Sequence, residues 1–285
     1  MTADGRLIVA TAGENEDLLW GLRGAGANLG IVTSFEYQLH PVGPVLGGMV
    51  VYPLSQGKEA LKLYDEFSNT CPDEVSTVAL LFTTPAGDPA VAIAVCYCGP
   101  LDRGEKVLEP LTRLGAPLAN DIAVKSYVHL QTMFDTAWPP GRLYYIKSNV
   151  VRRLEEAAID KYLDWAPTPL SAIAFQQLHG AASRVGPSDT AFPHRYDHFS
   201  LYIHPATDDP ADASKIVRWG RQCWEAMQPY VDRAVYVNGM EDAAAGSEQP
   251  VRDAYGANYE RLASLKKQYD PTNFFTGNQN IKPAA

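Results

Sequence analysis

The hydrophobic positions change their period along the chain. Between residues 47 and 238, runs that alternate every second residue are interleaved with stripes that repeat every three or four residues, as strands and amphipathic helices do. Strands are predicted at residues 47–52, 75–84, 90–98, 143–151, 171–179, 199–204 and 234–238, and helices at 55–69, 101–114, 127–138, 155–165 and 212–231. This order predicts an α+β fold in which helices cover one face of an antiparallel sheet.

The two ends of the chain have a different pattern. Short apolar runs predict strands at residues 7–10 and 33–39, on either side of a short helix that begins at the N-cap Asn15 and ends at Gly24. A proline and glycine cluster at residues 40–44 predicts a domain boundary. At the other end, an apolar stripe predicts one helix over residues 250–269, followed by an irregular tail.

Glycines 24, 26 and 30 lie between the first helix and the β-branched run that starts at Ile31. Such glycines permit positive φ or a close approach to the backbone, so the segment is either a cofactor-facing loop or a plain turn. A Rossmann fingerprint requires the pattern G-x-G-x-x-G between a strand and a helix. Here the order is helix, loop, strand and the spacing is G-x-G-x-x-x-G, which argues against that fingerprint.

Composition narrows the classes of partner. The 285 residues carry a formal net charge of −9, which argues against binding to nucleic acid or to an anionic membrane surface. No apolar run reaches the length of a membrane span, and no signal-peptide pattern is visible at the start. We therefore expect the protein to be cytoplasmic, or its compartment is unknown. Four cysteines are too few for a disulfide scaffold, and Cys96 and Cys98 are interpreted as small core residues rather than as a metal site.

Two stretches resemble a known family. They are L-W-G-L-R-G at residues 19–24 with G-A-N-L-G-I-V-T-S-F at 26–35, and Y-G-A-N-Y-E-R-L at 255–262 with Y-D-P-T-N-F-F at 269–275 and Q-N-I at 279–281. Both are similar to the FAD-linked oxidases of the berberine-bridge-enzyme-like family, which have a PCMH-type FAD-binding domain and belong to the vanillyl-alcohol-oxidase superfamily. Ala25 and Ala27 stand where many members have glycine.

The resemblance implies three domains and a cofactor. Residues 1–41 would be the C-terminal remnant of the FAD-binding domain, 42–238 the substrate-binding α+β domain, and 239–285 the berberine-like segment that returns to the FAD domain. The residues that the resemblance places near FAD are Gly26, Asn28, Gly30, Ile31, Val32, Tyr255, Asn258 and Asn280. From the residues alone, the last three also fit a helix stripe and a docked tail.

The family reaction transfers a hydride from a substrate carbon to the flavin while a base removes a hydroxyl or amine proton, and oxygen then reoxidises the flavin. Tyr236 and Tyr144 are the candidate bases. Many members have Tyr-x-Asn-Tyr, whereas in this chain the motif that begins at Tyr236 has Gly239 as its fourth residue. Lys147 and Arg195 are candidates for binding an anionic or carbonyl group of an alcohol, sugar or amine substrate, with ordinary ion pairing as the alternative.

Full-length relatives begin with a first FAD subdomain that carries a phosphate-binding loop and, in many members, a histidine and a cysteine that link to the flavin. No segment here matches these, so the chain is expected to be a C-terminal portion whose own affinity for FAD is in question. A missing N-terminal half, or a second copy, is the expected protein partner.

Three other functions compete with the oxidase. A non-redox binding protein could retain the substrate-domain sheet. A metal hydrolase could use His194, His198 and His204, but only Asp197 lies near them as a further ligand, and no metal is predicted. A Ser-His-Asp hydrolase is disfavoured because the chain has no G-x-S-x-G motif.

Overall fold

The structure is a computed structural model that describes residues 1–165, 167–240, 248–277 and 279–285. Its contacts divide the chain into two compact units. The terminal unit comprises Met1–Leu39, Ala181–Tyr196 and Arg233–Ala285, and the sheet unit comprises His40–Gly180 and Asp197–Asp232. Both termini and a central excursion of the chain therefore fold into the terminal unit.

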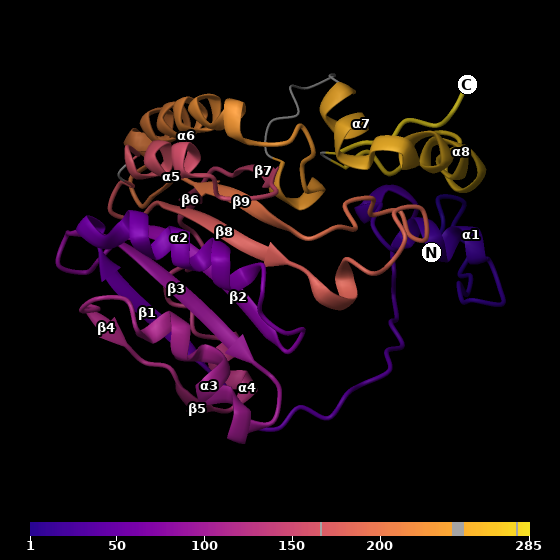
Figure 1. Cartoon of the computed structure of the whole chain (residues 1–285). Coiled ribbons are helices and arrows are strands. Elements are labelled where there is room, and N and C mark those ends of the chain that lie inside the picture. Colours follow the sequence, from indigo (N-terminus) through magenta and orange to yellow (C-terminus); the bar gives the residue numbers. More distant parts are fainter. Residues whose placement is uncertain (166, 241–247, 278) are drawn as a thin grey trace. The chain divides into compact units, whose positions relative to one another are not determined.

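The sheet unit is built on an eight-stranded antiparallel sheet with the order β4-β1-β3-β2-β8-β9-β7, in which β5 also pairs with β1 (Figure 1). Its strands are β1 Val45–Pro53, β2 Val75–Thr83, β3 Pro89–Tyr97, β4 Ala119–Asn120, β5 Ala123–Lys125, β7 Lys147–Val151, β8 Ala172–Leu178 and β9 His198–His204. All pairings in it are antiparallel. Five of the predicted strands are present with nearly the predicted bounds.

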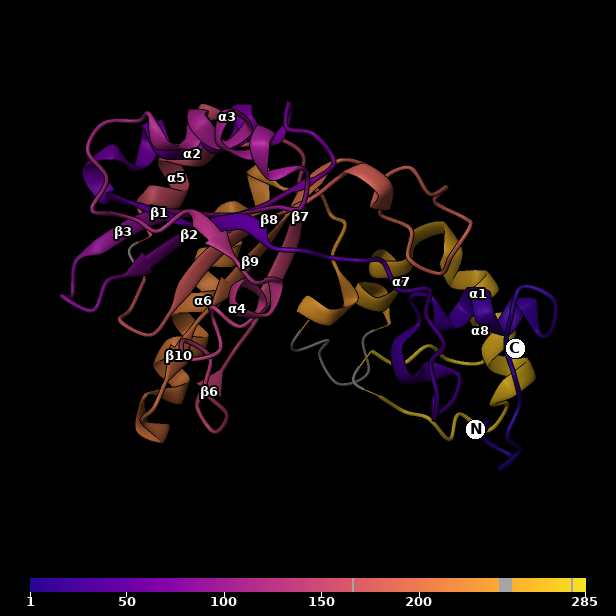
Figure 2. The same ribbon diagram turned by 90° about the horizontal axis from the view of Figure 1, so that it is seen from below.

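Four helices pack on one face of this sheet, namely α2 Gly57–Ser68, α3 Leu101–Thr112, α5 Glu156–Leu163 and α6 Ala213–Met227. Figure 2 shows α2, α3 and α5 together on one side of the strands. Each helix buries one stripe, as Ile216, Gly220, Cys223 and Met227 illustrate on α6. Every second strand residue meets these stripes in a single apolar core. The predicted α+β fold with helices on one face is confirmed.

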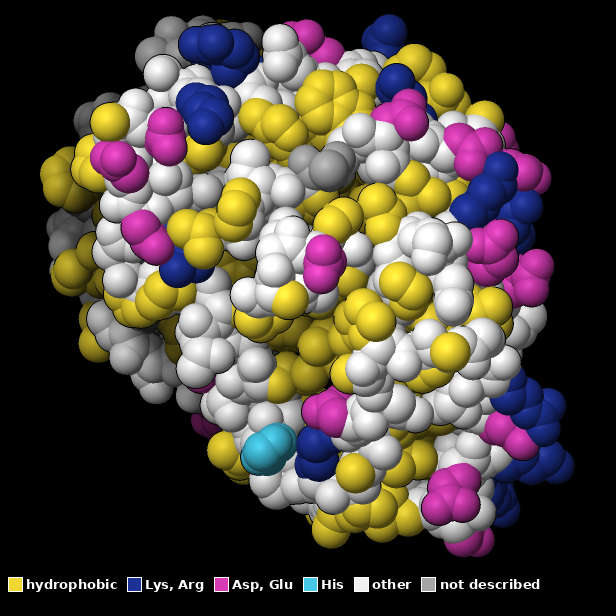
Figure 3. Space-filling model, turned by 90° about the vertical axis from the view of Figure 1, so that its left-hand side faces the viewer, with side chains coloured by type: hydrophobic (Ala, Val, Ile, Leu, Met, Phe, Trp, Pro, Cys, Tyr) yellow, Lys and Arg dark blue, Asp and Glu magenta, His cyan; other side chains and the backbone are white. Residues whose placement is uncertain are grey.

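The opposite face of the sheet has a smaller apolar cluster. Val51, Ala90 and Ala92 are buried there beside the partly buried Leu80 and Phe82. Helix α4, Tyr127–Gln131, packs on β1 at the end of this face. On the face of the molecule shown in Figure 3, acidic and basic side chains are interspersed around hydrophobic ones, so among its described residues it does not gather the positive charge that phosphate binding requires.

The strand predicted at residues 143–151 is in fact two strands. Residues Leu143–Tyr144 form β6, which pairs with β10, Ala206–Thr207, in a separate small sheet, and β7 begins only at Lys147. Between β6 and β7, the backbone N–H of Tyr145 bonds to the carbonyl of Pro205, 3.0 Å away. The helix predicted at residues 127–138 ends early, and the short strands β4, β5 and β10 were not predicted because two or three residues show no period.

The terminal unit contains short helices and irregular backbone. Its helices are α1 Glu16–Leu22, α7 Gln249–Tyr255 and α8 Tyr259–Tyr269. The single helix predicted over residues 250–269 is wrong, because Gly256 has φ +49° and a short 3₁₀ turn, η7 Gly256–Asn258, separates α7 from α8. Across both units, the other 3₁₀ turns of the described residues are η1 Gly26–Asn28, η2 Leu54–Gln56, η3 Gly180–Ala182, η4 Pro210–Asp212, η5 Gln228–Tyr230 and η6 Val237–Gly239.

Three predicted strands do not form. Residues 7–10, 33–39 and 234–238 are not strand in the structure, and residues 237–239 form η6 instead. The side chains of Leu7, Phe35 and Tyr37 are 74%, 66% and 71% exposed. Alternation predicts a strand only where a neighbouring strand supplies hydrogen bonds, and none of the described residues pairs with these segments as a strand.

Among the residues that the structure describes, no helix is long and apolar enough to cross a membrane.

Candidate functional site

The glycine-containing loop of the terminal unit is fixed by Asn28. The buried Asn28 side chain donates through Nδ2 to the carbonyls of Ala25 and Gln279, at 2.7 and 3.1 Å. Its Oδ1 accepts from the N–H of Ile281 at 2.8 Å. Two segments about 250 residues apart in sequence are thereby joined through one side chain. Asn28 is predicted to lie near FAD, but its amide N–H donors and its carbonyl oxygen are already bonded to the protein itself.

A buried ion pair completes this connection. Lys266 and Asp270 are both 0% exposed, and Lys266 Nζ lies 2.6 Å from Asp270 Oδ2. Lys266 also donates to the carbonyls of Asn28 and Phe275, at 2.8 and 2.7 Å, so all three of its N–H donors are used. Sequence reasoning missed this pair, although a lysine and an aspartate four residues apart at the end of a buried helix stripe are a usable signal.

The charge state of Asp270 follows from its partners. Burial alone would raise the pKa of Asp270, but hydrogen bonds from Lys266 and from the N–H groups of Phe275 and Phe274 outweigh it and leave the pKa lowered. Asp270 is therefore an ionised carboxylate at neutral pH. The Asn28, Lys266 and Asp270 side chains, which we call the polar knot, hold the loop, α8 and the tail as one piece.

A second group of polar side chains fixes the segment at residues 187–195. Asn258 is buried, and its Nδ2 donates to the carbonyls of Pro187 and Thr190 at 2.8 and 3.1 Å. Arg195 donates to Ala182 O and Thr190 Oγ1, at 3.2 and 2.9 Å, and burial lowers the pKa of its guanidinium. Both of these predicted ligand residues therefore have structural contacts in the terminal unit.

Two predicted flavin-side residues retain unused polar atoms. Tyr255 is 1% exposed, and its hydroxyl has no hydrogen-bond partner among the described residues. The Oδ1 atom of Asn280 is likewise buried without a partner in the described part of the chain. Burial raises the pKa of Tyr255, which keeps this side chain a neutral phenol. Because buried polar groups are rarely left unpaired, these atoms are the terminal unit's strongest indication of a ligand.

The loop itself has open and closed positions. Gly26 has φ +60°, and a Cβ atom there would meet nothing within 4 Å. At Gly30 a Cβ would lie 2.7 Å from the carbonyl oxygen of Met1, whose N-terminal amine donates to Ile31 O at 2.7 Å. Ile31 and Val32 are 50% and 38% exposed. The Gly26 end of the loop is therefore open to a close approach, and the Gly30 end packs against the first residues.

The two candidate bases differ in how their hydroxyls are bonded. Tyr236, in the terminal unit, accepts a hydrogen bond from Asn238 Nδ2 at 2.7 Å. Tyr144, in the sheet unit, donates to Pro139 O at 3.0 Å. The bond of Tyr144 therefore engages its hydroxyl proton, whereas the bond from Asn238 engages the hydroxyl oxygen of Tyr236.

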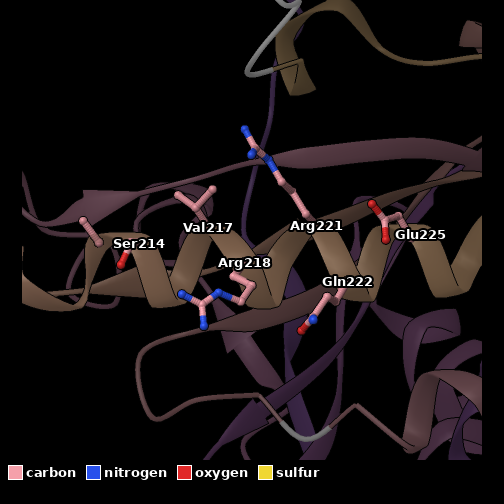
Figure 4. A pocket seen from close by; sticks show the side chains of 7 residues that line it. Ser214, Val217, Arg218, Arg221, Gln222 and Glu225 are labelled. Carbon is pink, nitrogen blue, oxygen red and sulfur yellow. The ribbon is translucent and has the colours of Figure 1, made fainter.

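Lys147 lies on the helix-covered side of the sheet. It is opposite Ile203 on β9, and its Nζ lies 5.4 Å from the ring centre of Trp224 on α6. The open groove beside this helix has a volume of about 570 Å³ and is lined by Ala213, Ser214, Val217, Arg218, Arg221, Gln222 and Glu225 (Figure 4). None of the residues predicted from sequence lines this groove.

The histidines do not form a shared site. His194 Nε2 lies 3.2 and 3.0 Å from the carbonyls of Val235 and Ala254, so it donates to the backbone. His204 stacks against Tyr202 in the sheet unit, and burial lowers its pKa to about 4. Among the described residues no three histidine, cysteine or acidic side chains are grouped as metal ligands.

Comparison with known proteins shows which class the chain resembles. Residues 235–282 match the family model described as berberine and berberine like. An FAD-linked oxidoreductase of Dictyostelium discoideum is 31% identical, over 98% of this chain and 61% of the relative. The chain thus spans about three fifths of the length of that relative.

Solved structures share the fold. BBE-like 1 of Physcomitrella patens superposes with a TM-score of 0.85 at 20% identity, over 100% of this chain and 64% of the other. The 6-hydroxy-D-nicotine oxidase of Arthrobacter nicotinovorans gives 0.84 at 22% identity, over 99% and 65%.

These findings relate the chain to the FAD-linked oxidoreductases. Its last part carries the berberine-like family match, and the chain as a whole corresponds to the C-terminal portion of its relatives. The resemblance carried by the two end segments is confirmed.

Proposed function

We propose that the chain supplies the flavin-facing tail and the substrate-domain sheet of an FAD-dependent oxidase. The observation that carries the proposal is a pair of buried atoms, Tyr255 Oη and Asn280 Oδ1, that have no partner among the described residues and lie on residues that the family resemblance places beside the flavin. They lie in the unit that carries the berberine-like segment. The polar knot in the same unit holds the loop that contains Gly26 to the C-terminal tail.

The residues present fit part of an FAD site. Tyr255 and Asn280 would each offer a polar atom to the cofactor, and the open backbone at Gly26 would permit a close approach. Asn28 and Asn258 would act indirectly, because their amides already hold neighbouring backbone. The chemistry that FAD supplies when bound is acceptance of a hydride.

In the proposed reaction, the substrate is an alcohol, a sugar or an amine. Tyr236 removes its hydroxyl or amine proton while a carbon of the substrate gives up a hydride. The hydrogen bond from Asn238 would orient the hydroxyl of Tyr236. Molecular oxygen is the proposed final acceptor. Arg195 would hold its segment in place, and its Nε, which is buried and unpartnered among the described residues, would remain available to a polar ligand group.

FAD titration with matched variants tests the cofactor proposal. Tyr255→Phe removes a hydroxyl that has no partner in the described part of the chain, so we expect the folded protein to be at least as stable while its affinity for FAD falls about tenfold, the size of one lost hydrogen bond. Tyr259→Phe is the control, because the Tyr259 hydroxyl already bonds to Glu248 at 2.6 Å. Equal FAD affinity in Tyr255→Phe and the wild type would contradict the proposed contact.

The catalytic assignment is tested with anaerobic, FAD-loaded protein and a panel of sugars, alcohols and secondary amines. Tyr236→Phe should slow bleaching of the flavin absorbance by about 10²-fold or more, whereas Tyr144→Phe should change it little. Folded wild-type protein that takes up no FAD would instead favour a non-redox binding role for the sheet unit.

A further inference from the structure

Two thiols lie side by side where β3 ends. Cys96 is the last-but-one residue of this strand and Cys98 follows the strand, and their Sγ atoms are 3.4 Å apart. Residues two apart along a strand project from the same face, which explains the approach. Cys98 is exposed and Cys96 is partly buried, so the interpretation of both as core residues is wrong for Cys98.

The surroundings leave the pair accessible. The residues opposite Cys96 on the flanking strands are Gly47 on β1 and Ser76 on β2, neither of which has a bulky side chain. The N–H of Cys98 bonds to Glu74 O at 2.9 Å, which holds its backbone beside β2. Burial and the neighbouring Cys98 raise the pKa of Cys96 to about 12, so Cys96 stays a thiol and the exposed Cys98 is the sulfur that a reagent meets first.

The other cysteines lack this arrangement. Cys223 is 0% exposed in the core of the sheet unit. Cys71 is partly buried, and its thiol lies 3.4 Å from the carbonyl of Ser68, to which it donates. These two cysteines serve as internal controls for any reaction assigned to the pair.

We propose that Cys96 and Cys98 form a dithiol site that closes reversibly to an intramolecular disulfide in the presence of a peroxide. The Cys98 thiolate attacks hydrogen peroxide, which breaks the O–O bond, gives a sulfenic acid and releases hydroxide. The Cys96 sulfur then attacks the Cys98 sulfur, and its proton leaves with the hydroxyl as water. In total, two thiols and one peroxide give one disulfide and two waters.

The resulting bond should be easily reduced. Two residues apart in a strand span about 6.6 Å between Cα atoms, which is at the upper end of the range that disulfides accept. A strained and exposed disulfide is the labile kind, so a small dithiol should reopen it. The site would thus respond to oxidant without any contribution from a flavin.

Intact mass spectrometry of Cys71→Ser/Cys223→Ser, in which only the pair remains, tests the proposal. One equivalent of hydrogen peroxide should lower the mass by about 2 Da and remove both thiols titratable with Ellman's reagent, and dithiothreitol should restore both. Adding Cys96→Ser to that background should give oxygen additions to Cys98 and no loss of 2 Da.

The wild-type chain gives an independent readout if the double variant does not fold. Chymotrypsin cleaves after Tyr97, which lies between the two cysteines, so an oxidised and alkylated digest should contain two peptides joined through Cys96 and Cys98. Oxygen additions to both cysteines without a link, a link to Cys71 or Cys223, or a disulfide between two chains would overturn the proposal.

Discussion

The sheet unit is built on strands whose apolar residues alternate, whereas the terminal unit adds to its own apolar cluster polar side chains that bond segments far apart in the sequence. In the sheet unit, Phe175 is buried between helices and strands and packs edge-on against Tyr162, with ring centres 4.6 Å apart. In the terminal unit, Asn28 and Lys266 bond to backbone groups of distant segments. A short-period apolar pattern can therefore specify the first unit but not the second.

The largest effect is expected for Lys266→Met. Removing the ammonium leaves the Asp270 carboxylate buried without its counter-charge, which should lower the free energy of unfolding by about 3–5 kcal/mol. Urea denaturation followed by circular dichroism measures this change. The control is Lys267→Met, because Lys267 is the exposed neighbour on the same helix and its replacement should change stability by less than about 1 kcal/mol. Equal losses in both variants would mean that the buried ion pair is not the cause.

Phe175→Ala should weaken the sheet unit comparably. The side chain is 0% exposed, so its truncation leaves a cavity and should cost about 3–5 kcal/mol. The same urea experiment measures the loss. Leu143→Ala is a suitable control, because that side chain is 39% exposed and should change stability little. A change below about 1 kcal/mol for Phe175→Ala would show that this core is not tightly packed.

Asn28→Ala should have a smaller effect, of about 2–3 kcal/mol. It leaves the Ile281 N–H and the Ala25 carbonyl without their partner, and both bonds lie in the buried interior. Hydrogen exchange should report it locally, with faster exchange of the Ile281 amide than in wild type. Unchanged protection of that amide would contradict the role given to Asn28.

The smallest effect is expected for the loss of stability at acidic pH. His204 has a folded-state pKa of about 4, lowered by burial, against about 6.5 for an unfolded chain. As the pH falls, His204 of the unfolded chain therefore takes up its proton before His204 of the folded chain does. The stability that comes from burying a neutral His204 is complete above pH 6.5 and is lost as the pH falls toward 4. His204→Phe should reduce the loss of stability over this window by about 1–2 kcal/mol. An unchanged pH dependence of stability in His204→Phe would contradict the assignment.

The secondary structure predicted from the sequence is more accurate in the sheet unit than in the terminal unit. Residues 75–84 and 90–98 were predicted as strands because their alternation matches the pairing that the sheet supplies. Residues 33–39 alternate as well, but no strand among the described residues pairs with them, so the pattern alone misleads. The helix break at Gly256 was missed because an apolar stripe crosses it. Local period carries no information on pairings between distant segments.

The candidate site was only partly predictable. Motif similarity pointed to Tyr255 and Asn280, but only the three-dimensional structure shows that each has a buried polar atom without a partner among the residues it describes. It also pointed to Asn28 and Asn258, for which the structure shows contacts to backbone. The sequence could not separate these two kinds of residue, because both are polar positions in the same motifs. The bonding difference between Tyr236 and Tyr144 likewise depends on neighbours that folding brings near.

The most direct test follows the two units separately in the same sample. Trp20 is the tryptophan of the terminal unit, and Trp138, Trp165, Trp219 and Trp224 belong to the sheet unit. In chain labelled with 5-fluorotryptophan, ¹⁹F spectra in increasing urea would therefore report each unit, with Trp20→Phe assigning the first signal. We predict that Lys266→Met shifts the midpoint of the Trp20 signal more than the other four, and that Phe175→Ala does the reverse. Equal shifts of all five signals in both variants would contradict the conclusion that the two units are stabilised by different interactions.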